Sequence, residues 1–299
     1  MKGSGVNVYL KIARVSNLPT VWANCIAGWL LGGGAEGLSS LGELTGLVSL
    51  VVLIFGASFV YSAGMVMNDA VDVGFDREHR PDRPLPSGEI SLNMAWGLAI
   101  ALLGGGVVLM VLASASPALS LLLAGMIIGY NVFHRRWEGS VWLMGGCRTL
   151  LYLVAASVAL PGGWFIEAVV IWAIALGVYT VGITLAARGE AEDKGTGKLG
   201  LSMLAAPLLA AVVIYFSRAD QSGVMVMISL IAWGGWSAFA VLLLLGQEEG
   251  RVSRSVAYLI AGMMLIDAMA ISFSYPWMSM VLMGMLPVVL LLQRRISAT

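Results

Sequence analysis

An acidic stretch ends one of the apolar runs of this chain, reading NDAVDVGFD at residues 68–76. In an α-helix, residues four apart lie on one face, so Asn68, Asp72 and Asp76 share a stripe. Carboxylates beside hydrocarbon are costly unless they bind a partner. Mg²⁺ takes oxygen ligands and completes its octahedron with water and phosphate oxygens, so a magnesium ion that holds a diphosphate suits this stripe. The expected ligands are Asn68, Asp69, Asp72 and Asp76.

The segment that follows is basic and rich in proline, reading REHRPDRPLPSGEIS at residues 77–91. An arginine can grip a phosphate group through two parallel hydrogen bonds. We therefore expect phosphate ligands at Arg77, Arg80 and Arg83. The alternative is a solvated loop in which these arginines only pair with the neighbouring acids.

The composition is that of a membrane protein. Of 299 residues, 59% are hydrophobic and 11% are charged, against about one quarter charged in soluble domains. A helix needs about 20 mainly apolar residues to cross the hydrocarbon layer. Such runs predict one all-α domain over residues 1–299, a polytopic membrane bundle of nine or ten transmembrane helices. The predicted spans lie near residues 15–35, 45–66, 92–113, 117–133, 139–160, 164–187, 200–217, 224–245, 255–274 and, beyond Pro276, 277–293.

The distribution of charge predicts how the bundle is oriented. Lysines and arginines gather before the first span and after every second span, whereas the opposite loops contain only Arg218. Because positively charged loops stay in the cytoplasm, the acidic stretch is expected on the cytoplasmic side of a bacterial or archaeal-type inner membrane. The first apolar run is long and lacks a clear cleavage site, so we expect a membrane helix there rather than a signal peptide. A net charge of zero argues against a nucleic-acid partner.

The two motifs together resemble the UbiA superfamily of intramembrane prenyltransferases. That superfamily has an Asn-Asp-x-x-Asp-x-x-x-Asp box followed by Arg-Pro-x-Pro-Ser-Gly, and this chain has both, as NDAVDVGFD and RPLPSG. Within the superfamily the chain is most similar to the EboC-like branch. The segments that carry this narrower resemblance are YNVFHRR at 130–136, GGCRTLLYL at 145–153 and ITLAARGEAED at 183–193.

A second polar loop, RGEAEDKGTGKLG at residues 188–200, follows the sixth span. It lies four helices beyond the first box, a spacing typical of two similar halves whose loops cover one cavity. The superfamily's second motif has two aspartates four residues apart, whereas here the position four before Asp193 is Gly189. Glu190 and Asp193 can still share a helical face and hold a second Mg²⁺. The site residues expected in this loop are Glu190, Asp193, Lys194 and Lys198; the alternative is a solvated loop whose charges cancel.

Two ionisable residues fall where hydrocarbon is expected. Arg148 lies about 13 Å into the fifth span, where a guanidinium costs at least about 2.5 kcal/mol. It is expected to hold an acceptor's carboxylate or a donor's distal phosphate, and the alternative is a salt bridge to a loop acid. Asp267, in the ninth span, has no local cation and is equally well explained by a protonated, hydrogen-bonded structural role.

Polar residues at the cytoplasmic ends of two spans are further candidates for substrate binding. Arg14 and Asn17 lie at the cytoplasmic mouth of the first helix, ahead of Pro19, and the resemblance implies that this region lines the acceptor pocket. Tyr130 and His134 end the fourth span and are suited to stacking on, or hydrogen bonding to, an aromatic acceptor. Such residues are also ordinary anchors at a membrane interface, which is the alternative for all four.

The resemblance implies transfer of an isoprenyl group from a prenyl diphosphate to a small aromatic or polar-lipid acceptor. Mg²⁺ is the implied cofactor, with Asp72, Asp76, Glu190 and Asp193 as the catalytic acids. The altered second motif leaves a rival open, a non-catalytic membrane carrier or assembly subunit for lipid or secondary-metabolite precursors.

Overall fold

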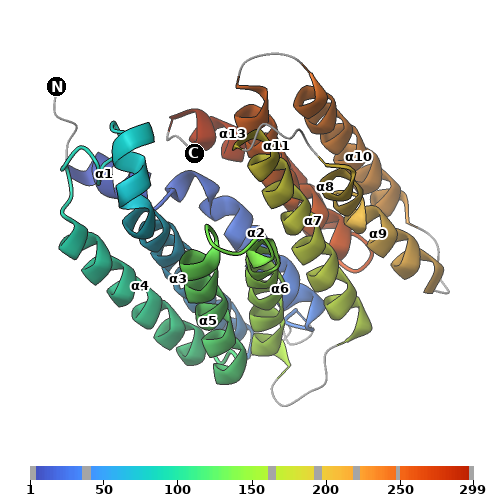
Figure 1. The fold of residues 1–299 in the computed structure, drawn as a ribbon. Coiled ribbons are helices and arrows are strands. Elements are labelled where there is room, and N and C mark those ends of the chain that lie inside the picture. The colour runs from blue at the N-terminus through green and yellow to red at the C-terminus, as the bar shows by residue number, and fades with distance from the viewer. Residues whose placement is uncertain are drawn as a thin grey trace.

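The computed structural model describes residues 5–35, 42–160, 166–191, 197–217, 223–246 and 250–295, and over these residues the chain is helical with no strand. Figure 1 shows the helices packed side by side as one bundle. The helices in the first half are α1 Gly5–Ile12, the 3₁₀ turn η1 Val15–Asn17, α2 Leu18–Leu31, α3 Gly42–His79, α4 Leu92–Leu112, α5 Pro117–Phe133 and α6 Ser140–Ala159. Those in the second half are α7 Glu167–Ala191, α8 Lys198–Met203, α9 Ala206–Ser217, α10 Val224–Leu245, α11 Arg251–Ile271, α12 Pro276–Gly284 and α13 Leu286–Arg295.

Local sequence explains where several of these helices begin. Pro117 and Pro276 open α5 and α12, where the missing N–H of proline costs no helical hydrogen bond. Ser91 caps α4, since its hydroxyl accepts a hydrogen bond from the Met94 amide at 3.2 Å. These starts agree with the predicted spans to within a few residues.

The prediction of an all-helical membrane bundle is confirmed, and its count of nine or ten spans is approximate. Among the described residues, eight segments are long and apolar enough to cross a membrane, including Pro276–Arg294, which α12 and α13 form together. Pro117–Phe133 is apolar but has 17 residues, and α2 has 14. Two expected spans are therefore shorter than a full crossing normally requires.

The helices alternate in direction and so bring the polar segments to one end. In Figure 1 the carboxyl ends of α3 and α7 lie towards the top of the bundle, and the connection between α5 and α6 lies at the upper ends of those two helices. At 1.5 Å per residue α3 is about 57 Å long, far more than the thickness of the hydrocarbon layer. Its last turns, which carry the acidic box, therefore form part of the polar end.

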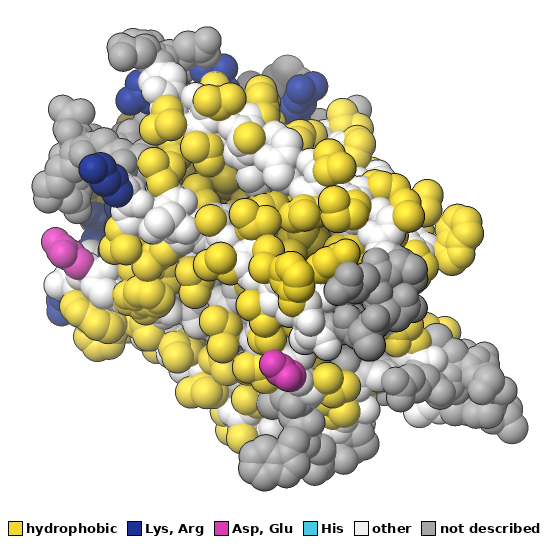
Figure 2. Space-filling model, turned by 90° about the vertical axis from the view of Figure 1, so that its right-hand side faces the viewer, with side chains coloured by type: hydrophobic (Ala, Val, Ile, Leu, Met, Phe, Trp, Pro, Cys, Tyr) yellow, Lys and Arg dark blue, Asp and Glu magenta, His cyan; other side chains and the backbone are white. Residues whose placement is uncertain are grey.

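Burial separates a central helix from those that face lipid. In α11, 72% of the apolar window is buried, compared with 17% in Pro276–Arg294. Figure 2 shows the complementary surface, with hydrophobic side chains over the broad middle of the face and lysines and arginines towards its upper and left edges. An apolar belt bordered by cations is the surface expected of a protein that spans a bilayer.

A close approach of α3 and α4 depends on glycine. A Cβ atom added at Gly106 would lie 2.8 Å from the Gly56 carbonyl oxygen and 2.6 Å from Val60 Cγ2. We expect Gly106→Ala to lower the free energy of unfolding by about 1–3 kcal/mol, because the helices must move apart. Gly104→Ala is the matched control, since a Cβ there meets nothing within 4 Å. Thermal unfolding in detergent measures both, and equal stability of the two variants would contradict the close packing.

Candidate active site

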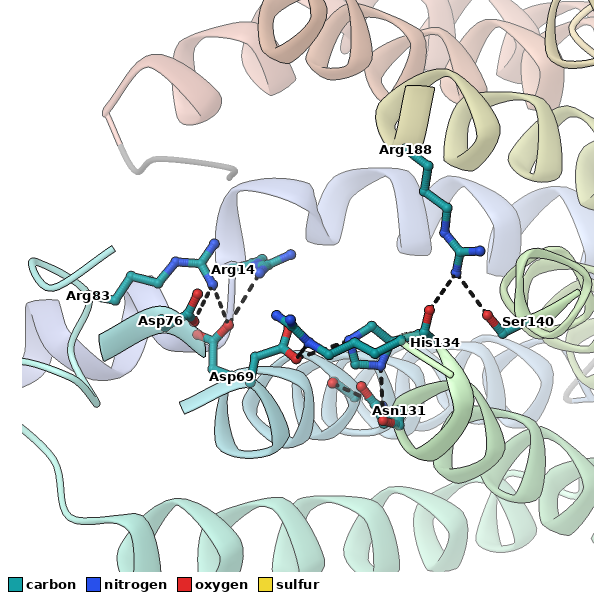
Figure 3. Close-up of polar contacts among 11 residues, drawn as sticks. Arg14, Asp69, Asp76, Arg83, Asn131, His134, Ser140 and Arg188 are labelled. Atoms are coloured by element: carbon teal, nitrogen blue, oxygen red, sulfur yellow. Dashed lines mark hydrogen bonds and ion pairs between the residues drawn. The ribbon is translucent and has the colours of Figure 1, made fainter. Parts of the chain in front are cut away.

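Two carboxylates of the acidic box are bound by arginines from outside α3. Asp69 Oδ1 accepts hydrogen bonds from Arg14 Nη2 at 3.3 Å and from Arg83 Nη1 at 3.4 Å. The same Arg83 nitrogen donates to Asp76 Oδ2 at 2.8 Å, and Asp76 is buried. Figure 3 shows Arg14 and Arg83 approaching these acids from two sides. The basic segment therefore folds back over the end of the helix that precedes it.

Apolar anchors and a tight turn hold this basic segment in place. Leu85 and Ile90 are buried and pack in a cluster with residues of α3, α4 and Ile12. The Ser87 amide donates to the Arg83 carbonyl oxygen at 2.9 Å, and Gly88 takes a positive φ of 77°, which glycine adopts without strain. Burial of Leu85 and Ile90 thus fixes the loop that carries Arg83.

Asp72 belongs to a second polar network. Its Oδ1 accepts from Arg135 Nε at 2.5 Å and lies 3.1 Å from His134 Nε2. The Arg135 guanidinium also lies 4.0 Å from the centre of the Phe75 ring, a favourable cation–π position. His134, predicted as an acceptor-binding residue, thus contacts the acidic box, and so does Arg135 of the same YNVFHRR motif, for which no site role was predicted.

Arg188 fixes the connection between α5 and α6. Its Nη2 donates to the His134 carbonyl oxygen at 3.1 Å and to Ser140 Oγ at 2.8 Å, and its Nη1 donates to the Glu138 carbonyl oxygen at 3.0 Å. Figure 3 shows this arginine reaching across from α7. No site role was predicted for Arg188, although its place at the end of an apolar span, within the segment ITLAARGEAED, was an available signal.

The donor atoms of the box suit Mg²⁺ in kind, but their present partners are cations of the protein. Carboxylate and amide oxygens are its usual ligands. Asp72 is bonded through Oδ1 and Asp76 through Oδ2, so each carboxylate has a second oxygen for a metal. Among the described residues no three His, Cys, Asp or Glu side chains converge on one metal position. The acids and arginines do pair, as the alternative anticipated, although Asp76 and Asp69 are buried rather than solvated.

An apolar cavity of about 290 Å³ lies inside the bundle. Its walls include Ala57, Val60, Ile127, Leu151, Ile183 and Met263. The predicted site residues Arg14, Asn17, Tyr130 and Arg148 also line it. The fold therefore brings together residues of α3, α5, α6, α7 and α11 with η1 and the residue before it, segments that are far apart in the sequence.

A second hollow, of about 560 Å³, lies at the polar end and is rich in cations. Arg14, Arg80 and Arg83 line it, together with Lys11 and Asp69. Arg14 is the residue that lines both this basic pocket and the apolar cavity. Its backbone is left-handed, with φ 46° and ψ 48°, an uncommon conformation that turns the chain between α1 and η1.

Side chains of other helices hold Arg148, predicted within the membrane, and Asn17, predicted at the mouth of the first helix. Arg148 donates to Asn24 Oδ1 at 2.6 Å and to Thr20 Oγ1 at 3.3 Å, so in the described part of the chain its partners are not the loop acid of the alternative. Asn17 Oδ1 accepts from Gln293 Nε2 at 3.1 Å. Both residues thus combine a position on the cavity wall with fixed side chains.

Several predicted site residues lie away from these networks. Arg77 and Lys198 are exposed, and Arg80 reaches only the basic pocket. Asn68 is half-buried within α3. Asp193 and Lys194 lie outside the described residues, and Glu190 belongs to α7 without a described side chain.

Arg83 offers a direct test of the first network. Replacing Arg83 by Gln leaves Asp76 buried beside a neutral partner, and breaking such a pair typically costs about 3 kcal/mol or more. We expect a clear fall in the thermal unfolding temperature in detergent. Arg80→Gln, in the same loop and exposed, should leave the temperature nearly unchanged. Equal stability of the two variants would show that the Arg83–Asp76 pair contributes little.

The fold and these contacts define an integral membrane protein with an internal apolar cavity beneath a charged mouth. The chain belongs to the UbiA prenyltransferase family, whose sequence model matches residues 21–248. Solved structures share its fold. They include a UbiA homolog from Aeropyrum pernix K1, with a TM-score of 0.63 and 18% identity over 87% of this chain and 97% of that one. Another, from Archaeoglobus fulgidus, has a TM-score of 0.54 and 16% identity over 87% and 99% of the two chains.

Curated archaeal relatives match part of the chain. The digeranylgeranylglyceryl phosphate synthase of Methanoculleus marisnigri is 31% identical over 153 residues, 47% of this chain and 51% of the relative. The enzyme of the same name from Methanocaldococcus jannaschii is 40% identical over 104 residues, 35% and 34% of the two chains. The chain thus spans about half or less of the length of these relatives. The names of these relatives do not specify the EboC-like branch, so that narrower resemblance stays a prediction.

Proposed function

We propose that this protein is a Mg²⁺-dependent intramembrane prenyltransferase, formed by a single domain over residues 1–299. It would move an isoprenyl group from a prenyl diphosphate to a small aromatic or polar-lipid acceptor. The observation that carries the proposal is the position of Arg14, which lines both the basic pocket and the apolar cavity. A charged head group and an apolar chain of one molecule fit two such adjoining sites. The names of the family and of the archaeal relatives support the same chemistry.

The protein's own residues would bind the diphosphate at the polar end. Arg83 and Arg14 already lie beside the acids, and guanidinium groups bind phosphate oxygens well. Mg²⁺, when bound, supplies the positive charge that stabilises the departing diphosphate. The proposed metal ligands are Asn68, Asp69, Asp72 and Asp76, with Glu190 and Asp193 for a second ion. Arg77, Arg80, Lys194 and Lys198 are proposed as further phosphate-binding residues.

The cavity would supply the remaining requirements of the reaction. Its apolar walls exclude water from the electron-poor allylic carbon, which water would otherwise capture. Tyr130 and His134 stack on one another with ring centres 5.5 Å apart, and we propose that they and Asn17 orient the acceptor. The acceptor's electron-rich atom would then bond to the allylic carbon as the carbon–oxygen bond to diphosphate breaks, and the acceptor would give up the proton that the new bond replaces, which the released diphosphate can take.

Diphosphate release is the decisive measurement. Purified protein in lipid nanodiscs, supplied with Mg²⁺, a panel of labelled prenyl diphosphates and candidate acceptors, should release diphosphate and form prenylated product. The rival proposal, a non-catalytic carrier for lipid or secondary-metabolite precursors, is favoured by the altered second acidic motif. It predicts saturable binding of a prenyl diphosphate with no release from any donor.

We further propose that the polar end faces the cytoplasm, as the positions of the lysines and arginines suggest. Ser87 is exposed in the loop beside the basic pocket. In a variant whose native Cys25 and Cys147 are replaced by alanine, Ser87→Cys should react with a membrane-impermeant maleimide only from the cytoplasmic side. A cysteine at Ser116, in the connection at the other end of the bundle, is the control and should react from outside. Labelling of Ser87→Cys from outside would invert the proposed orientation.

A further inference from the structure

A hydrogen-bonded network of three polar side chains, Arg148, Asn24 and Asp267, crosses the centre of the bundle, away from the acidic box. Asn24 on α2 accepts a hydrogen bond from Arg148 Nη1 on α6 at 2.6 Å. The same Asn24 side chain donates through Nδ2 to Asp267 Oδ2 on α11 at 2.6 Å. Asn24 and Asp267 are both fully buried, whereas Arg148 lines the apolar cavity. Side chains of three helices thus form one hydrogen-bonded network that ends at the Arg148 guanidinium on the cavity wall.

Arg148, the cation of this network, has only neutral groups as hydrogen-bond partners among the described residues. Arg148 donates to the amide oxygen of Asn24 and the hydroxyl of Thr20, and within the described residues no carboxylate forms an ion pair with it. Asp267 is reached only through Asn24, and its Oδ1 has no hydrogen-bond partner. Buried ionisable groups inside a membrane are costly and mark functional sites. Replacing a buried ionic network by apolar side chains often leaves a protein as stable or makes it more stable. A contribution to stability therefore does not by itself explain this network.

Position along α3 separates Arg148 from the acidic box. The Arg148 guanidinium lies 5.9 Å from the centre of the Tyr61 ring. Tyr61 and Asp72 are about 16 Å apart along the helix, at 1.5 Å per residue. The two phosphate groups of a diphosphate are adjacent, so a diphosphate held at Asp72 cannot also reach Arg148. An anion at Arg148 would have to be a different group.

We propose that Arg148 binds an oxyanion of the acceptor, a carboxylate or a phosphate, on the wall of the apolar cavity. Asn24 and Asp267 are positioning residues in this assignment, because the Asp267 carboxylate orients the Asn24 amide, whose oxygen then holds the guanidinium. Arginine has five N–H donors, and its planar fork matches an oxyanion. The inference deepens the proposed function, since it rests on the cavity being the acceptor site.

Binding without donor or metal tests this assignment. Wild-type protein in zwitterionic nanodiscs is titrated by calorimetry with two matched pairs, 4-hydroxybenzoate against 4-hydroxybenzamide and hexyl phosphate against hexanol. We expect a preference of about 10-fold or more for the oxyanion in at least one pair. A preference confined to the first pair identifies a carboxylate acceptor, and one confined to the second pair identifies a phosphate head group. Equal binding within both pairs overturns the proposal.

Variants separate recognition from folding. Arg148→Gln alone would remove the positive charge of the network and leave Asp267 in place. The substitution is therefore combined with Asp267→Asn, so that the net charge of the three side chains does not change. This double variant should lose the preference, and Arg148→Lys should keep part of it. Arg136→Gln, an exposed arginine beyond α5, is the matched control and should bind as wild type does. Retention of the full preference by the folded double variant overturns the assignment.

The positioning role and the proposed function are tested separately. Asn24→Ala should reduce the preference at least about 3-fold while leaving the affinity for the neutral probe unchanged, which a merely structural role would not do. An unchanged preference in Asn24→Ala removes the positioning role. Mg²⁺-dependent binding of geranyl diphosphate is measured on the same Arg148 double variant, and a loss there that exceeds the loss of oxyanion preference would assign Arg148 to the donor instead. If wild type prefers oxyanions but binds no prenyl diphosphate, the proposed function fails while this site remains.

Discussion

Replacing Asp72 by Ala should abolish Mg²⁺-dependent binding of a prenyl diphosphate while the protein remains folded. Asp72 lies at the centre of the proposed metal stripe, and its carboxylate is held between His134 and Arg135. Loss of even an indirect partner of a metal typically costs 10–100-fold in affinity, so we expect a loss of at least about 100-fold for a direct ligand. The measurement is calorimetric titration with geranyl diphosphate, with and without Mg²⁺, in nanodiscs.

The fold should tolerate this change because Asp72 is only half-buried at the polar end of α3. Glu78→Ala is the matched control, since Glu78 is an exposed acid on the same helix. It should bind the diphosphate as wild type does. If the Asp72 variant keeps its Mg²⁺-dependent affinity, the magnesium site at the box is wrong and the carboxylate serves only its pairs with His134 and Arg135.

The double change Glu190→Gln and Asp193→Asn should lower turnover by at least about 100-fold, or about 2.7 kcal/mol of transition-state stabilisation. Negative charge builds up on the diphosphate as its bond to carbon breaks, so a catalyst gains more from a second cation than a binder does. Binding of the intact donor should change much less. Steady-state diphosphate release and equilibrium binding, measured on the same preparation, separate the two effects.

Glu192→Gln is the control for this experiment because it removes a charge from the same loop at a position with no proposed ligand role. It should retain turnover within a few-fold. If wild type shows no turnover with any donor and binds prenyl diphosphates equally with or without Glu190 and Asp193, the catalytic proposal fails. The carrier proposal then takes its place.

The sequence alone determined the class of the protein and the location of its acids. Hydropathy and helical periodicity depend on residues that are neighbours in the chain, so the spans and the acid stripe follow from local spacing. The box and the Arg-Pro-x-Pro-Ser-Gly stretch indicated the family that the family model confirms. The sequence also showed that the second loop departs from the superfamily's second motif, because Gly189 stands where that motif has an aspartate.

Only the tertiary structure decided which residue partners each ionisable side chain. Arg14 reaches Asp69 from 55 positions away, and Arg148 reaches Asn24 from 124. Asp267, which had no local cation in the sequence, finds Asn24 at a separation of 243. Such pairs form because helix packing places distant residues together, and no local pattern in the chain encodes that distance. The same packing assembled Arg14 and Arg148 on one apolar cavity, where Arg148, whose hydrogen-bond partners among the described residues are neutral, becomes the proposed site for an anionic ligand.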